Sequence, residues 1–135
     1  MECGMVLTHL NVQPGECIVV KGTVLPDAKR FALNMGKTSS ELALHFNPRF
    51  ESHGDTAVIV CNSLAAGEWG QEQREPHFPF QPGQDAKVCV SFDAQELMVT
   101  LPGEQQILFP NRLGLEAIGF FSVEGDFRVK SIKFK

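Results

Sequence analysis

A group of polar side chains at residues 45–49 is the most informative chemical feature of the sequence. His45, Asn47 and Arg49 alternate with Phe46 and Pro48, and alternate residues of an extended strand point to the same face. The strand would therefore present an imidazole, an amide and a guanidinium together, a dense set of directional donors and acceptors. Phe46 would point into the core. Pro48 lacks a backbone donor, which predicts that this strand lies at an edge or ends nearby.

A second polar group follows at residues 69–74. Trp69 is the only tryptophan, and its ring could form a flat apolar platform beside the small Gly70. Glu72 and Arg74 share one face if the segment is extended, so Arg74 can hold the Glu72 carboxylate in a charge-assisted pair. Three more polar residues lie between the two groups: His53, Asp55 and Asn62.

These residue types fit the chemistry of a sugar. A pyranose has hydroxyl groups that donate and accept hydrogen bonds, and it also has an apolar face of C–H groups. An aromatic ring would cover that face, while polar side chains would bind the hydroxyl groups around its edges. An axial hydroxyl, such as O4 of galactose, could be bound from one side by His45, Asn47 and Arg49. The arrangement predicts a site that distinguishes sugar epimers.

The segments that carry these residues predict an all-β protein. They are short, rich in β-branched residues, Phe and Leu, and separated by Gly- or Pro-containing turns, which favours a two-sheet jelly-roll sandwich. In the segment 41–46, alternation assigns Leu42 and Leu44 to the core face and Ala43 to the opposite face. The predicted strands are 17–24, 29–35, 41–46, 56–62, 86–92, 96–101, 106–109 and 127–134.

Composition narrows the classes of function. A chain of 135 residues, 43% hydrophobic and 21% charged, suits one domain covering residues 1–135. The net charge is −4 and the basic residues form no run, which argues against nucleic acid, an anionic membrane or any other polyanion as a partner. No apolar stretch could span a bilayer and residues 1–10 do not resemble a signal peptide, so we expect cytosolic synthesis without membrane insertion.

The four cysteines predict free thiols in a reducing compartment. They form no CxxC pair that would indicate a zinc site, and a domain of this size does not need disulfides to fold. We expect neither a metal nor another cofactor. The cysteines are Cys3, Cys17, Cys61 and Cys89.

At the two polar groups the sequence resembles the galectins, the family of β-galactoside-binding lectins, and most closely its single-domain prototype members, which form homodimers. HFNPRF (45–50) followed at this distance by WGQEQRE (69–75) is the most specific part. The resemblance covers nearly the whole chain. It extends to NVQPGE (11–16), GD (54–55), IVCNS (59–63), FPFQPG (78–83) and GDFRVK (125–130).

The resemblance implies a jelly-roll β-sandwich of two antiparallel sheets, galectin-like or concanavalin-like, with a sugar groove across one sheet. It implies that His45, Asn47 and Arg49 bind galactose O4 and that Arg49 also reaches the ring oxygen. Asn62 and Glu72 would bind O6. The second sugar, glucose or N-acetylglucosamine, would be contacted by Arg49, Glu72 and Arg74, with His53 and Asp55 near that end, and Trp69 would stack on the galactose.

The function implied is that of a lectin that reversibly binds lactose or N-acetyllactosamine glycans. Residues 5–10 and 129–134 resemble the edge strands through which prototype members form a homodimer, and such a dimer would crosslink cell-surface or matrix glycoconjugates. The family also implies release to the extracellular space by a non-classical route, after synthesis in the cytosol.

Two alternatives compete with the lectin hypothesis. Asp55 and Glu72 could be the paired carboxylates of a glycosidase, but nearby Arg74 and Arg49 would lower a carboxyl pKa, the reverse of what a general acid needs. We therefore predict that the protein is not an enzyme. The other alternative is a galectin-like protein-interaction module with a vestigial sugar groove, yet this chain has kept every polar residue of the motif.

Overall fold

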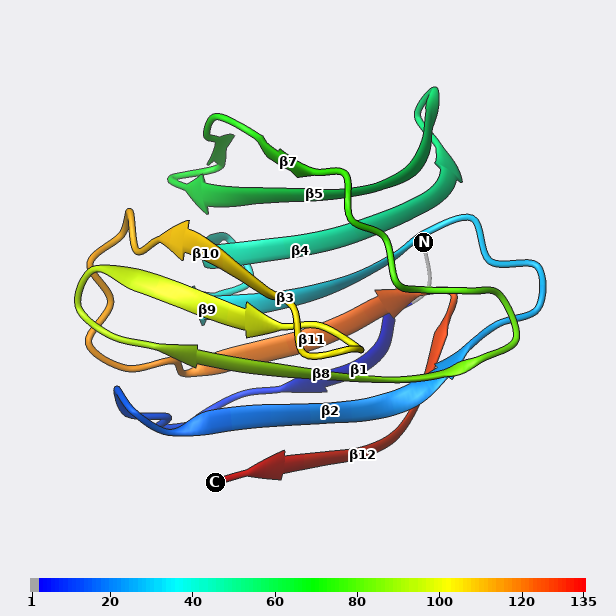
Figure 1. Cartoon of the computed structure of the whole chain (residues 1–135). Coiled ribbons are helices and arrows are strands. Elements are labelled where there is room, and N and C mark those ends of the chain that lie inside the picture. Colours follow the sequence, from blue (N-terminus) through cyan, green and yellow to red (C-terminus); the bar gives the residue numbers. More distant parts are fainter. Residues whose placement is uncertain (1–2) are drawn as a thin grey trace.

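The computed structural model describes residues 3–135 as two antiparallel β-sheets packed face to face (Figure 1). Twelve strands and no helix are found among these residues. The prediction of an all-β sandwich is confirmed. The described part of the chain has no helix that is long and apolar enough to cross a membrane.

The two sheets differ in size, and the larger one carries the predicted site residues. Its strand order is β1-β11-β3-β4-β5-β6, and β7 also pairs with β5. These strands are β1 (Cys3–Leu7), β3 (Phe31–Thr38), β4 (Glu41–Ser52), β5 (Asp55–Ala65), β6 (Glu68–Trp69), β7 (Gln73–Glu75) and β11 (Phe120–Gly125). The smaller sheet is ordered β10 (Gln106–Pro110), β9 (Glu96–Thr100), β8 (Asp85–Phe92), β2 (Cys17–Val24) and β12 (Phe127–Phe134).

Sequence patterns missed one central strand. None of the predicted strands covers residues 120–125, because Gly125 indicates one of the Gly-containing turns, but β11 runs through to that glycine and pairs with β1 and β3. Gly125 has a φ of 86°, and a Cβ there would lie 2.8 Å from the Arg30 carbonyl oxygen, so glycine is needed where the strand ends. β1 ends at Leu7, before the end of the predicted edge segment 5–10.

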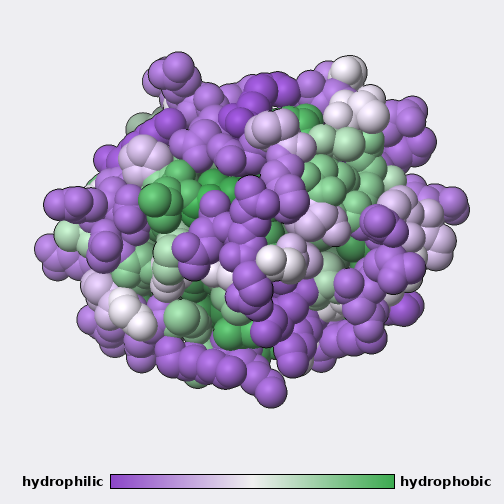
Figure 2. Space-filling model, in the orientation of Figure 1, coloured by the Kyte–Doolittle hydropathy of each residue, from purple (hydrophilic) through white to green (hydrophobic). Residues whose placement is uncertain are grey.

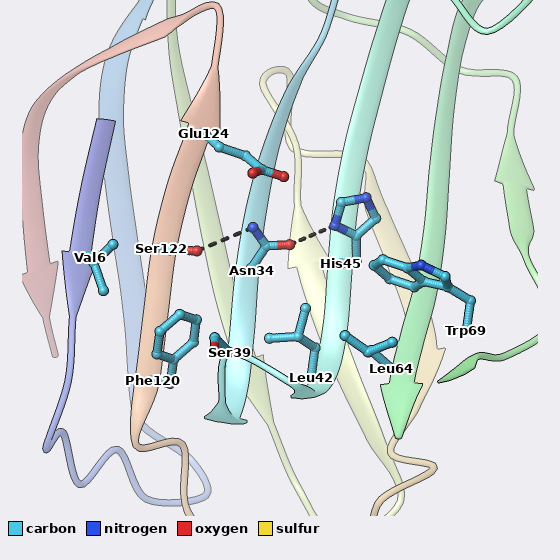
Figure 3. Close-up of a pocket in the computed structure, with 10 residues that line it drawn as sticks. All are labelled: Val6, Asn34, Ser39, Leu42, His45, Leu64, Trp69, Phe120, Ser122 and Glu124. Carbon is cyan, nitrogen blue, oxygen red and sulfur yellow. Dashed lines mark hydrogen bonds between the residues drawn. The ribbon is translucent and has the colours of Figure 1, made fainter. Parts of the chain in front are cut away.

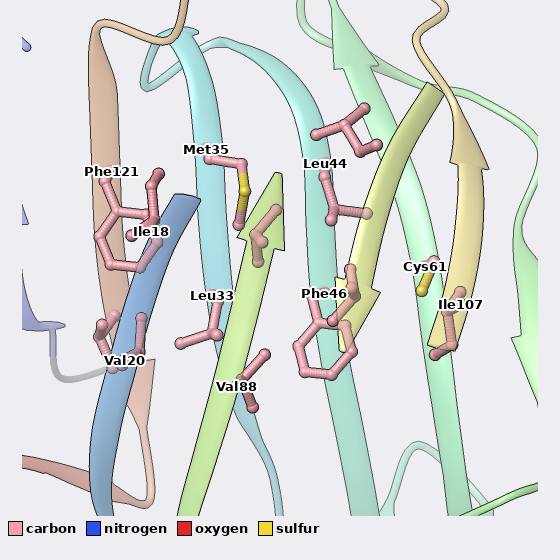
Figure 4. Packing of buried hydrophobic residues seen from close by; sticks show 14 of the residues in the cluster. Ile18, Val20, Leu33, Met35, Leu44, Phe46, Cys61, Val88, Ile107 and Phe121 are labelled. Carbon is pink, nitrogen blue, oxygen red and sulfur yellow. The ribbon is translucent and has the colours of Figure 1, made fainter. Parts of the chain in front are cut away.

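The hydrophobic core lies between the two sheets (Figure 4). Phe46 and Phe121 from the larger sheet and Ile18 from the smaller sheet are fully buried. Burial of such side chains supplies most of the driving force for folding. Other buried residues drawn in Figure 4 include Val20, Leu33, Met35, Leu44, Val88 and Ile107.

An irregularity in β4 changes the predicted alternation of its first residues. The pairing of β4 with β5 shifts register between Leu42 and His45, as happens at a bulge. Ala43 therefore joins the core, whereas Leu42 lines an outer hollow with His45 (Figure 3). The predicted faces of Leu42 and Ala43 are wrong because the period of two breaks here. From His45 onward the alternation holds, and Phe46 is buried.

Pro48 predicted that its strand lies at a sheet edge or ends nearby, and of these two possibilities the sheet edge is wrong. β4 is an interior strand with β3 on one side and β5 on the other. The continuous ladder with β3 ends at Leu33 and Phe46, and continuing that register places Phe31 opposite Pro48. The Phe31 carbonyl accepts a 2.8 Å hydrogen bond from the side-chain amide of Asn47. The asparagine thus supplies the donor that proline lacks, which lets proline occupy an interior strand.

The thiols of Cys17, Cys61 and Cys89 are free, as predicted. Burial raises the pKa of the Cys61 thiol to about 12, which keeps it protonated and unreactive. The side chain of Cys3 lies outside the part of the chain that the structure describes.

The β5–β6 turn yields a stability prediction. Ala66 and Gly67 both have positive φ, 52° and 79°, which is the type I′ geometry that favours Asn or Gly at both positions. We expect Ala66→Gly to raise the free energy of unfolding by about 0.5–1 kcal/mol, because glycine adopts this conformation without steric cost. Urea unfolding measures the effect. The control Ala65→Gly, in strand β5, should destabilise, and a loss of stability in Ala66→Gly would contradict the assignment.

Candidate functional site

A groove on the outer face of the larger sheet collects most of the predicted site residues. It has a volume of about 520 Å³. Strand β4 places three of the predicted side chains on this face, as the alternation required, and β5 and β6 add two more. The predicted residues that line it are His45, Asn47, Arg49, His53, Asn62, Trp69 and Glu72. Asp55 and Arg74 are outside the lining but are joined to it by ion pairs.

The exposed ring of Trp69 stands beside the imidazole of His45. The β5–β6 hairpin turns Trp69 back against Leu64, and the two ring centroids lie 4.8 Å apart. The Trp69 side chain is 53% exposed, which is unusual for a large aromatic residue and typical of a binding surface. Gly70 leaves room for this arrangement, since a Cβ there would lie 2.9 Å from both Ser63 and Arg112.

A chain of hydrogen bonds fixes the orientation of His45 (Figure 3). The Asn34 amide donates to Ser122 Oγ at 3.2 Å, so its Oδ1 is the atom that faces His45 Nδ1 at 2.6 Å. Because Oδ1 can only accept, Nδ1 must carry the proton. The neutral imidazole then offers its Nε2 as a hydrogen-bond acceptor.

The surroundings of His45 keep it neutral. Desolvation by burial is the main cause that lowers its pKa, from 6.5 to about 4. Glu124 acts in the opposite direction, while Arg30 and Arg49 add to the lowering. At neutral pH the site therefore contains an acceptor nitrogen where an exposed histidine would be partly cationic.

Asn47 and Arg49 are held as two donors next to that acceptor. Asn47 is 1% exposed, its amide donates to the Phe31 carbonyl, and its Oδ1 accepts a 3.0 Å bond from Arg49 Nε. These contacts fix the asparagine and leave its second N–H as a donor. Arg49 Nη1 donates to Asp55 at 2.7 Å. Its guanidinium is thereby locked at one edge of the groove.

Four charged side chains form one alternating series at this edge. Asp55 accepts from Arg49 and, through its other oxygen, from Arg74 at 2.8 Å. Arg74 also binds Glu72 through two donors, at 2.9 and 3.1 Å, as the sequence predicted. The hydrogen bonds from Arg74 and Arg49 lower the pKa of Asp55, so this carboxylate is ionised and occupied. It is therefore unsuited to be the proton donor of a glycosidase.

Several residues that support the groove were not predicted from the sequence. Arg112 donates to Ser63 Oγ at 3.1 Å and approaches Asn62 Oδ1 at 3.4 Å, while the Asn62 amide donates to the Gly70 carbonyl. Arg112 thus helps to hold the Asn62 side chain in position. Two further residues, Arg30 and Glu124, line the groove as an ion pair. No local motif marks these residues, because they come from segments remote in sequence.

A more apolar hollow continues the groove past His45 and Trp69 (Figure 3). Its volume is about 480 Å³, and Val6, Leu42 and Phe120 are among its lining residues.

Among the described residues, no group of three or more His, Cys, Asp or Glu side chains could hold a metal ion.

Residues 4–134 match the family described as galactoside-binding lectins. The chain belongs to the galectin family. It is 58% identical over 134 residues to a 16 kDa β-galactoside-binding lectin of Gallus gallus, covering 99% of both chains. Because galectins are lectins, the prediction that the protein is not an enzyme is confirmed.

Solved galectin structures share the whole fold. The homodimeric agglutinin CG-16 from chicken liver superposes with a TM-score of 0.94 at 56% identity, covering 97% of this chain and 98% of that one. A toad ovary galectin, solved in complex with thio-digalactose, gives a TM-score of 0.95 at 42% identity over 100% of both chains. The jelly-roll sandwich expected from the resemblance is therefore confirmed.

The lowered pKa of the buried His45 imidazole predicts how the stability of the protein depends on pH. Unfolded chains take up the His45 proton near pH 6.5, whereas the folded galectin takes it up only near pH 4. Between these values the unfolded state binds more protons, so His45 should lower stability as the pH falls from 6.5 toward 4. Urea unfolding across this range should show a shallower decline in His45→Gln. NMR should show His45 protonated on Nδ1 alone at pH 6, and a doubly protonated ring there would contradict the assignment.

Proposed function

We propose that the groove reversibly binds β-galactosides, with no covalent chemistry. The observation that carries this proposal is the placement of one acceptor, His45 Nε2, beside the donors Asn47 and Arg49 and the exposed ring of Trp69. This set is complementary to a pyranose that carries an axial hydroxyl on one side of its ring and an apolar C–H face on the other. The three polar side chains would bind the hydroxyl, and Trp69 would cover the apolar face. The related chicken lectin and the toad galectin bound to thio-digalactose support the same ligand class.

The hydrogen-bonding capacity of a hydroxyl explains why His45 must be neutral. Galactose O4 has one proton and two lone pairs. Asn47 and Arg49 can only donate toward it, and together they would occupy both lone pairs. The O4 proton then needs an acceptor, which His45 Nε2 provides. Protonated His45 would add a third donor for which O4 has no lone pair left.

Selectivity for galactose over glucose follows from the same arrangement. An equatorial O4, as in glucose, would not reach all three side chains at once. Groups desolvated by the sugar but left unpaired cost about 1–3 kcal/mol each, which is enough to reject the epimer.

The remaining predicted residues complete the proposed site. Trp69 stacks on the C–H face of galactose, and Asn62 and Glu72 bind O6. The second sugar lies toward the charged series at the edge of the groove. It is contacted by Arg49, Glu72 and Arg74, with His53 and Asp55 near that end.

Calorimetric titration with lactose and cellobiose tests this function. The two disaccharides differ only in the configuration at C4 of the non-reducing sugar, so we expect binding of lactose alone, at one site per chain. Micromolar to millimolar affinity is expected for a shallow polar groove. Trp69→Ala should weaken lactose binding by at least about tenfold, because the stacking surface is lost.

Leu108→Ala is the matched control for Trp69→Ala. Leu108 is also a large apolar side chain with 50% exposure, but it lies on β10 of the other sheet, so lactose affinity should not change. No lactose binding by the folded protein would favour the vestigial-groove alternative. Equal affinity for cellobiose would contradict the proposed role of O4.

We also infer that two copies pair through β1 and β12, so that one dimer displays two sugar sites. Both strands are sheet edges, and they lie next to each other. Val6 on β1 and Phe134 on β12 are 52% and 47% exposed. Unpaired edge strands with exposed apolar side chains favour antiparallel pairing across a two-fold axis. The likeness to the homodimeric chicken agglutinin supports this inference. Such a dimer, released from the cytosol, would crosslink glycans with gained avidity.

Light scattering over a concentration series tests the dimer. We expect twice the 14.9 kDa chain mass at tens of micromolar and dissociation on dilution. Val6→Asp, which places a charge on the β1 edge, should shift the protein to monomer while each chain keeps its affinity for lactose. A wild-type protein that stays monomeric throughout would overturn this inference.

A further inference from the structure

The outer face of the smaller sheet carries a cluster of cations that no sequence run reveals. It comprises Lys21 on β2, Lys87 on β8, and Arg128 and Lys130 on β12, which we call the basic patch. All four side chains are exposed. β8, β2 and β12 are neighbouring strands (Figure 1), so the fold brings together residues from distant parts of the chain.

The pairing of the strands places like charges against each other. Lys21 and Lys87 are direct register partners in the β2–β8 ladder, where facing side chains lie about 5 Å apart at Cβ and like charges destabilise the sheet. Lys130 lies beside Lys21, at the bulge where β12 pairs with β2. Lys21, Lys87 and Lys130 border a shallow hollow of about 450 Å³ whose floor includes Gly22.

One carboxylate compensates only part of this charge. Asp85 binds Lys130 at 2.8 Å and Thr23 Oγ1 at 2.7 Å. Among the ion pairs of the described residues, this is the one that involves the basic patch. Four cations against one anion leave a local excess of three positive charges on a chain whose net charge is −4.

We propose that the basic patch binds a sulfated polysaccharide, at a site separate from the galactoside groove. A sulfated glycan is a flexible linear polyanion that can lie across neighbouring strands and meet Lys87, Lys21 and Lys130 in turn. Its sulfate groups would neutralise the positive charge of the opposed lysines Lys21 and Lys87. The patch is on the smaller sheet and the groove is on the larger sheet, so both ligands can be bound at once.

The face favours a soluble chain over an anionic bilayer. Proteins that bind membranes through a flat face usually add apolar side chains that insert between headgroups. Among the described residues, the large exposed apolar side chains are Val6, Trp69, Leu108 and Phe134, and none of them borders the hollow of the patch. Figure 2 shows hydrophilic residues along the lower margin of the molecule, where β2 and β12 lie in Figure 1.

Titration of the full chain with a heparin-derived octasaccharide tests the proposal. We expect binding at low salt that weakens steeply as NaCl is raised, because exposed charges are screened, and that is unchanged by saturating lactose. The double variant Lys21→Gln/Lys87→Gln should bind the octasaccharide at least about tenfold more weakly, with unaltered affinity for lactose. Its thermal midpoint should not fall, since a repulsive pair has been removed.

The matched control is Lys29→Gln/Lys37→Gln, which removes the same charge from exposed lysines outside the patch. This variant should bind the octasaccharide like the wild-type protein. Equal losses in both double variants would show an effect of net charge alone and overturn the patch. Competition by lactose would instead place the polyanion in the groove. Binding to phosphatidylserine vesicles without binding to the octasaccharide would also overturn the proposal. Neither competition by lactose nor vesicle binding would change the outcome of the calorimetric titration with lactose, which tests the groove.

Discussion

The pairing of β4 with β3 on one side and β5 on the other is the constraint on which the groove depends. It sets His45 opposite Asn34 and Asn62, so that a 2.6 Å hydrogen bond can hold the imidazole in one tautomer. A slip of one residue would turn every polar side chain of β4 into the core. Phe46 and Leu44 are buried between the sheets. The slip would expose both side chains to water, so their burial opposes it. The hydrophobic core thus determines the chemistry of the outer face.

The groove concentrates polar and charged groups without leaving them uncompensated. Arg49, Asp55, Arg74 and Glu72 alternate in sign along one edge, and their hydrogen bonds fix side chains that would otherwise lose entropy on binding a ligand. His45 belongs to the neutral part of the site, where an acceptor is needed. Preorganisation of both parts lets a small polar ligand bind with little rearrangement of the protein.

The two outer faces of the sandwich have different electrostatic character. On the larger sheet, arginines are matched by carboxylates, as in the Arg30–Glu124 pair. On the smaller sheet, Lys21 and Lys87 face each other, and among the described residues Asp85 is the carboxylate that borders the hollow beside them. A neutral hydroxyl-rich ligand suits the first face, and a polyanion suits the second. Two sheets packed back to back keep these surfaces apart, so that binding at one need not alter the other.

Local sequence determined which strand carries the site and which side chains it presents. Alternation alone places His45, Asn47 and Arg49 on one face, and Trp69 follows a tight turn whose positive φ Gly67 adopts without steric cost. What the sequence could not determine is which distant residues meet these side chains. Asn34, Ser122 and Arg112 reach the site from other strands and loops, and β11 was mistaken in part for a turn because Gly125 ends it. The sheet edge expected at Pro48 was wrong because the sequence does not show that Asn47 replaces the missing N–H. The Asn47 side chain donates to the Phe31 carbonyl on the neighbouring strand. Period and turn chemistry are properties of neighbouring residues, whereas strand order, bulges and the protonation of a buried histidine depend on contacts that form only when the sheets pack.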